Sequence, residues 1–227
     1  MIKNNTLFID FDSTFIKVET LDILADIVMK NDTDAQNKKK LISDITILAM
    51  SGDIDFQTAL HKRLNILSFT KNDILKVIER LSQLISDSII RNKKFFQVNA
   101  TNIWIISGGF KEIITPIVAE YGILPHHVIA NSFIFNGDKI IGCDESQDLY
   151  KDKGKIKAIH KLNINSQKIM IGDGYTDYEV FFNGEVNHFI CYTENIIREK
   201  VSQLSTLHAN SFDDVIEIMN NLSSVST

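Results

Sequence analysis

The stretch LFIDFDST, residues 7–14, decides the fold of this chain. Its apolar run, residues 7–9, predicts a strand buried on both faces, as strands of parallel sheets are. Two acidic residues, Asp10 and Asp12, follow this strand at once and are separated by a single residue. Charged groups at the end of a buried strand need partners, so this pair indicates either a metal ion or a catalytic role.

Length and composition are those of a globular protein. The chain has 227 residues, of which 44% are hydrophobic, so it can bury the core of one large domain or of one domain with an insertion. The net charge of -5 gives no positive field that would attract nucleic acid or an anionic membrane. No apolar run approaches the roughly 18 residues of a membrane span, and the first residues lack a signal-peptide pattern, so we expect a cytoplasmic protein. The spacing of Cys143 and Cys191 predicts reduced, structural thiols.

A helical insertion is expected directly after the first strand. The next clear buried strand is 103–106, and the stretch between the two strands is too long for a single crossover. Apolar residues recur with helical spacing in 21–29 and again in 41–50. Asp55 and Thr70 are suitable N-caps for two further helices. We therefore expect a small helical subdomain over about 16–86, with an α/β core formed by 1–15 and 87–227.

The rest of the chain alternates strands with helices. Short apolar runs predict strands, and Asn136-Gly137 predicts the turn of a hairpin between 128–135 and 139–143. The expected strands and helices are 103–106, 111–121, 155–162, 168–171, 178–182 and 188–191. This pattern is typical of a doubly wound α/β fold with a parallel sheet, in which ligands bind at the carboxyl ends of the strands. Runs that end at Asp10, Ser107 and Asp173 should therefore converge at one edge.

Residues 10–14 read Asp-x-Asp-x-Thr, which resembles the nucleophile motif of the haloacid dehalogenase superfamily of phosphohydrolases. The longer stretch DFDSTFIKVET, residues 10–20, resembles the phosphoserine phosphatase branch. The resemblance implies a Rossmann-like core with a helical cap (lid) over the active site. It also implies a magnesium-dependent phosphomonoesterase that hydrolyses O-phospho-L-serine, in the last step of serine biosynthesis, through an aspartyl-phosphate intermediate.

Other activities remain open at this point. The same motif fits a phosphotransferase to an amino-acid alcohol such as homoserine, or a phosphatase of another small phosphorylated metabolite. A non-catalytic phospho-receiver module is also doubly wound and acidic, but it would not have a large insertion after the first strand.

The acidic residues suggest a cation site. Asp10, Asp12, Asp173 and Asp177 would repel one another and a phosphate ester, so a hard divalent cation with oxygen ligands is expected among them. By resemblance, the Mg²⁺ ligands are the side chains of Asp10 and Asp173 and the backbone carbonyl of Asp12, with Asp177 orienting metal-bound waters. Asp10 is the implied nucleophile, and Asp12 the implied general acid and base.

Phosphate binding is expected from two glycine-containing segments. Ser107 and the backbone amides of Gly108 and Gly109, at the start of a helix, can hold phosphoryl oxygens. In KDKGK, residues 151–155, the resemblance assigns the phosphate-binding lysine to Lys153, although its neighbours Lys151 and Lys155 remain alternatives.

The insertion should determine the substrate. By resemblance, Glu19 binds the amino group of phosphoserine and Arg63 binds its carboxylate, while Met50 and Phe56 shield it. Arginine suits this role because its planar guanidinium can bind a carboxylate through two hydrogen bonds. The expected partner is thus a small phosphorylated metabolite, phosphoserine first, and neither nucleic acid nor a membrane.

Overall fold

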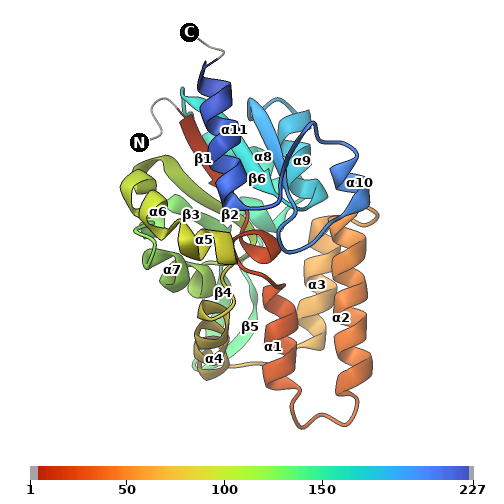
Figure 1. The fold of residues 1–227 in the computed structure, drawn as a ribbon. Helices are drawn as coiled ribbons and strands as arrows, with labels where there is room; N and C mark the ends of the chain where they lie inside the picture. The colour runs from red at the N-terminus through yellow and green to blue at the C-terminus, as the bar shows by residue number, and fades with distance from the viewer. Residues whose placement is uncertain (1–4, 225–227) are drawn as a thin grey trace.

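A six-stranded sheet lies at the centre of the computed structural model, which describes residues 5–224 (Figure 1). Its strand order is β3-β2-β1-β6-β7-β8, and each adjacent pair is parallel. The strands are β1 (Asn5–Ile9), β2 (Ile103–Phe110), β3 (Val128–Asn131), β6 (Gln167–Gly172), β7 (His188–Tyr192) and β8 (Leu207–Ala209). The expected doubly wound α/β fold is therefore confirmed.

Helices connect these strands and form the insertion between β1 and β2. The insertion holds α1 (Thr20–Val28), α2 (Ala35–Met50), α3 (Phe56–Ile66) and α4 (Lys71–Ser82). The other helices are α5 (Asp87–Arg91), α6 (Lys93–Asn99), α7 (Lys111–Ala119), α8 (Gly154–Lys161), α9 (Tyr175–Phe182), α10 (Glu199–Ser202) and α11 (Phe212–Ser224). Short 3₁₀ turns occupy Ala100–Asn102, Pro125–His127 and Asp148–Tyr150.

The core has two layers because side chains alternate across the sheet. Phe8 and Met170 lie on one face, in a cluster with residues of α8 and α9 such as Ile159 and Val180. Side chains of the opposite face, such as Ile9 of β1, pack in the larger cluster with residues of α6, α7 and α11. Helices thus cover both faces of the sheet, as its apolar strands require.

The helices α1 to α4 lie together at the carboxyl ends of the strands, away from the two termini (Figure 1). The N-caps predicted for α3 and α4, Asp55 and Thr70, are confirmed. The carboxylate of Asp55 accepts a hydrogen bond from the Thr58 N–H at 2.8 Å. Thr70 and Asp73 form a reciprocal capping box. The helix expected at 41–50 is longer than predicted, because α2 already begins at Ala35.

The predicted hairpin has a different first strand. Residues 128–131 form β3 in the main sheet, and the hairpin consists of β4 (Phe133–Asn136) and β5 (Lys139–Cys143). Burial explains the division, since β3 is almost entirely buried whereas three of the four residues of β4 are exposed. The expected turn is present, and Gly137 adopts φ +60° there. The hairpin reaches the insertion, where Lys71 N–H donates to the Asp138 carbonyl at 2.9 Å.

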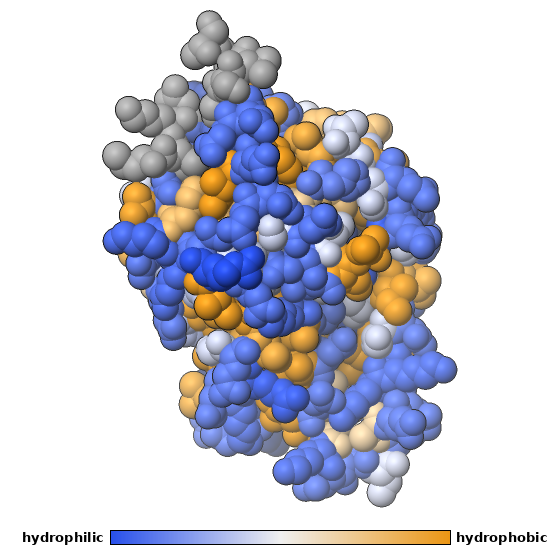
Figure 2. All heavy atoms as spheres, viewed as in Figure 1, coloured by the Kyte–Doolittle hydropathy of each residue, from blue (hydrophilic) through white to orange (hydrophobic). Residues whose placement is uncertain are grey.

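Most of the face in Figure 2 is hydrophilic, and its hydrophobic side chains form separate patches. None of the helices in residues 5–224 combines the length and the apolar composition that a membrane span needs.

A cluster of aromatic rings supports the segment that follows β1. Phe15, Tyr121 and Phe212 lie around the fully buried Phe96, with ring centroids 5.6, 5.6 and 4.6 Å from it. These rings come from four parts of the chain, so Phe96 joins α6, the turn after α7 and α11 to the loop after β1.

We expect Phe96→Ala to lower the free energy of unfolding by about 3–5 kcal/mol, because it removes a large buried ring and leaves a cavity. The matched control is Phe182→Ala, whose ring is 72% exposed and whose loss should change stability by less than about 0.5 kcal/mol. Urea denaturation followed by circular dichroism measures both values. Equal effects of the two substitutions would contradict the central place given to Phe96.

Candidate active site

The loop after β1, residues 10–15 (the nucleophile loop), brings two carboxyl groups to the edge of the sheet. Asp10 is 4% exposed, and its N–H donates to the Ile171 carbonyl of β6 at 2.9 Å. Residues 11–15 then form a single wide turn, within which Ser13 has φ +54°. This left-handed conformation costs a non-glycine residue about 1–2 kcal/mol. The surrounding contacts must therefore hold the turn in place.

Asp12 is held by Thr20, the first residue of α1. Its Oδ1 accepts hydrogen bonds from the Thr20 N–H at 2.9 Å and from the Thr20 hydroxyl. Its other oxygen atom, Oδ2, faces Gly109. Burial, then the nearby Glu19, raises the pKa of Asp12 well above its usual range. A raised pKa favours a carboxyl group that carries a proton and can transfer it.

Asp10, Asp173 and Asp177 form a buried acidic cluster whose oxygen atoms lie within 4.8 Å of one another. Asp173 follows β6 and Asp177 lies in the first turn of α9, as convergence at the carboxyl ends predicted. Burial is the main cause that raises the pKa of Asp173 to about 6, and it also raises the pKa of Asp177. Asp177 Oδ2 in addition accepts the Gly174 N–H at 3.0 Å.

Lys155 is the lysine that contacts these carboxylates. Its Nζ lies 2.9 Å from Asp10 Oδ1 and 2.6 Å from Asp177 Oδ1, and its side chain is 8% exposed. Burial alone would lower its pKa, but the attraction of the two carboxylates outweighs burial and raises it. The ammonium group therefore stays charged beside Asp10.

The structure differs here from the sequence-based assignment of Lys153. Lys153 is exposed and precedes α8 with φ +56°, in the left-handed region. Helix α8 begins one residue later, at Gly154, where a Cβ atom would collide with the Asp148 carbonyl. Because α8 begins at Gly154, its second residue, Lys155, points to Asp10. Lys153 lies outside the helix and is exposed to solvent.

Ser107, Gly108 and Gly109 lie at the end of β2, beside the nucleophile loop. The Ser107 side chain is buried, and its Oγ accepts the Gly109 N–H at 2.9 Å. A side chain at Gly108 would collide with the Phe56 ring, so glycine is needed there. Contrary to expectation, these glycines are not in the first turn of a helix, because β2 continues to Phe110.

Asn131 of β3 approaches the same turn. Its Nδ2 donates to the Gly108 carbonyl at 2.9 Å. Its Oδ1, fully buried, has no hydrogen-bond partner among the residues described. An orphaned acceptor of this kind is rare in folded proteins and points to a missing donor or ion.

All four residues expected to contact substrate line one cavity with Asp10, Asp12 and Lys155. These are Glu19, Met50, Phe56 and Arg63, and the cavity has a volume of about 30 Å³. Arg63 is 4% exposed and donates to Thr46 Oγ1 at 3.1 Å and the Ala59 carbonyl at 3.3 Å. In residues 5–224 it forms no ion pair, so its charge faces the cavity without a direct carboxylate partner.

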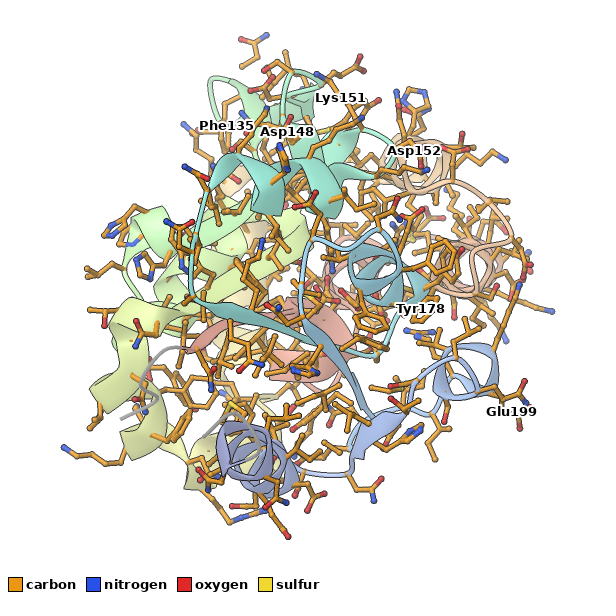
Figure 3. The ribbon with its side chains drawn as sticks, turned by 90° about the horizontal axis from the view of Figure 1, so that it is seen from above. Phe135, Asp148, Lys151, Asp152, Tyr178 and Glu199 are labelled. Atoms are coloured by element: carbon orange, nitrogen blue, oxygen red, sulfur yellow. The ribbon has the colours of Figure 1, made fainter. Side chains whose placement is uncertain are left out.

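A larger cavity of about 320 Å³ adjoins the first one, and the two share Phe56, Gly108, Lys155 and Thr176. Its walls are residues 49–56 of the insertion and the segments before α8 and in α9. Figure 3 shows Lys151 and Asp152 on the loop that forms part of this wall, next to the insertion.

Arg198 is a site residue that the sequence analysis missed. Its Nε lies 2.6 Å from Asp173 Oδ2, and its Nη2 lies 3.1 Å from Glu19 Oε1. No motif marks it, because it lies in the irregular segment before α10. Its position after β7 was the available signal, since that strand ends at the same edge of the sheet as β1 and β6.

The charges of the site suit a divalent cation. Among the described residues, the carboxyl groups of Asp10, Asp12, Glu19, Asp173 and Asp177 face three cationic side chains, those of Lys155, Arg63 and Arg198. Two negative charges remain uncompensated when all are ionised. Carboxylate oxygens within 4.8 Å of one another are a hard donor set of the kind that Mg²⁺ prefers.

Sequence comparisons agree with this geometry. The family model of haloacid dehalogenase-like hydrolases matches residues 7–181. The phosphoserine phosphatase of Drosophila melanogaster is 31% identical over 212 residues, 91% of this chain and 75% of that protein. The human phosphoserine phosphatase is 30% identical over the same length, 89% of that protein. The chloroplastic phosphoserine phosphatase of Arabidopsis thaliana is 29% identical, and this chain spans 64% of its length.

Solved structures show the same fold. A phosphoserine phosphohydrolase-like protein from Francisella tularensis superposes with a TM-score of 0.85 at 33% identity, over 94% of this chain and 99% of that one. A substrate-bound phosphoserine phosphatase superposes with a TM-score of 0.75 at 20% identity, over 95% of this chain and 99% of that one, which supports the fold alone. The match over residues 7–181 and the relatives at 30% identity or more show that this chain belongs to the haloacid dehalogenase-like hydrolases.

Proposed function

We propose that this chain is a magnesium-dependent phosphatase that hydrolyses O-phospho-L-serine to L-serine and phosphate. The observation that carries the proposal is the buried Arg63, which faces the cavity of Asp10 and Glu19 and, within residues 5–224, has no carboxylate partner of its own. An unpaired buried charge is costly, so a ligand carboxylate would relieve it. Relatives named phosphoserine phosphatases support the same substrate.

In this proposal Asp10, Asp173 and the backbone carbonyl of Asp12 hold Mg²⁺, with Asp177 beside them. The bound cation supplies charge neutralisation for the phosphoryl oxygens. Lys155 restrains the Asp10 carboxylate, because its Nζ contacts Asp10 Oδ1 at 2.9 Å. Ser107 and the amides of the following glycines would bind the remaining phosphoryl oxygens.

Two carboxyl groups would then share the chemistry. Asp10 attacks phosphorus while the bond to the seryl oxygen breaks and Asp12 donates its proton to that oxygen. Asp12 next takes a proton from the water that attacks the aspartyl phosphate, which releases phosphate and restores Asp10. The hydrogen bonds from Thr20 fix Asp12 Oδ1, so Oδ2, on the Gly109 side, is free to carry the proton.

We propose further that residues 16–86 act as a cap over this site. The inner cavity of about 30 Å³ has room for one water molecule. Phosphoserine is larger, so the insertion has to move away from the sheet to admit it and return to bring Glu19 and Arg63 to it.

The first test is phosphate release from a panel of phosphomonoesters, with Mg²⁺ or with a chelator. We expect kcat/KM to be highest for O-phospho-L-serine and turnover to need Mg²⁺. Asp10→Asn should lower kcat by about a thousandfold or more, as the loss of a nucleophile does. Equal turnover of esters without an amino-acid group would overturn the substrate, and phosphate found on an added alcohol would indicate a transferase.

Arg63→Ala should lower kcat/KM for phosphoserine by about 10- to 150-fold, because it removes hydrogen bonds between the guanidinium and the substrate carboxylate. Turnover of p-nitrophenyl phosphate, which has no carboxylate, should change little. The exposed neighbour Lys62 provides the control Lys62→Ala, for which neither substrate should be affected. A parallel loss on both substrates would mean that Arg63 does not read the carboxylate.

The two candidate lysines can be separated by substitution with methionine. Lys155→Met should lower kcat by about 100-fold or more, because it removes the charge beside Asp10. Lys153→Met should leave kcat within about threefold, since exposed lysines contribute little to buried chemistry. Thermal unfolding of both variants controls for lost stability. The reverse order would restore the sequence-based assignment of Lys153.

A further inference from the structure

The chain passes between the sheet and the insertion at two places that lie side by side. Ile16 and Ile85 form an isolated antiparallel bridge there. Backbone hydrogen bonds on both sides of the bridge join the two crossings. Ser86, at the second crossing, is fully buried. We call residues 15–17 and 84–86 the hinge ribbon.

Asn195, in the loop after β7, inserts its side chain between these crossings. Its Nδ2 lies 2.7 Å from Ser86 Oγ and 3.1, 3.3 and 3.4 Å from the carbonyl oxygens of Ser13, Thr14 and Ile16. The Ser86 hydroxyl donates to the Thr14 carbonyl at 2.7 Å, so its oxygen is free to accept. An amide NH₂ group offers two donors and therefore fits among several acceptors, where a carboxylate would be repelled.

Two of the peptide units that Asn195 holds, those of Ser13 and Thr14, belong to the nucleophile loop. Ser13 has its strained φ of +54°, and its hydroxyl donates to Glu19 at 2.7 Å. The Thr14 hydroxyl donates to Asp173 at 3.0 Å. The same peptide units thus position side chains that contact carboxylates of the candidate active site. A shift of Asn195 would be transmitted to both.

The loop that carries Asn195 is anchored on both sides. Before it, the Glu194 carboxylate accepts hydrogen bonds from the N–H of Ser88, at 3.0 Å, and from its hydroxyl. After it, Lys200 Nζ lies 2.9 Å from Asp53, in the turn between α2 and α3. Glu199, by contrast, points outward (Figure 3). The segment therefore contacts α5, next to the second crossing, and the α2–α3 turn of the insertion, and Asn195 lies between these two anchors.

We propose that Asn195 is a positioning residue that couples the hinge ribbon to the nucleophile loop. One side chain then determines both the orientation of the insertion and the geometry of the carboxylates at the edge of the sheet. The kinetic part of this inference rests on the proposed phosphatase function, whereas its structural part does not.

The test uses two variants and a control in the full-length protein. Asn195→Asp keeps the shape but turns an oxygen toward three carbonyl oxygens, and Asn195→Ala removes the donor without adding repulsion. The control is Thr193→Ala, two residues earlier, whose hydroxyl contacts Ala209 and Asn210 away from the hinge ribbon. All three are compared with the wild type.

Hydrogen–deuterium exchange of the protein without ligand measures the coupling directly. In Asn195→Asp we expect the backbone N–H groups of Lys17 and Ser86 to exchange about tenfold faster or more, because local opening becomes easier. The amides of α4 should keep their protection, and Thr193→Ala should match the wild type. A variant with weakened stability alone would instead show faster exchange throughout the chain.

Kinetics provide the second measurement. We expect kcat to fall about tenfold or more on both phosphoserine and p-nitrophenyl phosphate, since small misplacements of reacting groups cost this much. Exchange and kcat within about twofold of the wild type in both variants would overturn the inference. If the wild type hydrolyses no ester, the proposed function fails and the exchange experiment alone decides the role of Asn195. If Asn195→Asp does not fold, Asn195→Ala is judged by the same criteria.

Discussion

Lys155 and its contacts with Asp10 and Asp177 are the interaction on which the rest of the candidate site depends. The three residues come from α8, the end of β1 and α9, and all are nearly inaccessible to water. Loss of one partner from a buried ion pair costs about 3–5 kcal/mol, because the other charge is left uncompensated. The ends of these elements are therefore held together at one edge of the sheet.

In this arrangement the carboxylates of the site outnumber its cationic side chains. Lys155 and Arg198 each contact two carboxylates, and neither compensates all the negative charge around Asp173. Burial raises the pKa of Asp173 to about 6 although Arg198 pairs with it, so one guanidinium does not fully compensate this carboxylate and its acidic neighbours. The same shortage that destabilises the ligand-free site would favour a divalent cation and, with it, a phosphate ester.

The insertion forms one wall of a cavity whose acidic residues Asp10 and Asp12 follow β1 of the sheet. Glu19 precedes α1 and Arg63 lies in α3, yet both line the cavity that contains Asp10. The Phe56 ring packs against Gly108, so this part of the insertion contacts the turn that would bind phosphate. The chain crosses to the insertion through the hinge ribbon, and the nucleophile loop lies next to it. The same backbone segments therefore support the insertion and the carboxylates at the edge of the sheet.

The sequence by itself determined the doubly wound sheet, the position of the insertion and the residues Asp10, Asp12, Ser107 and Asp173 at one edge. These follow from local rules, because apolar runs predict buried strands and parallel strands end at the same side. It did not distinguish Lys153 from Lys155, since three lysines within five residues have the same chemistry. That choice depends on the residue at which α8 begins and on the left-handed φ before it. Arg198 and Asn195 lie in a loop without periodicity, and only the tertiary structure brings them to the site. The partners of Asn195, and Glu19 as a partner of Arg198, are more than a hundred residues away in the chain.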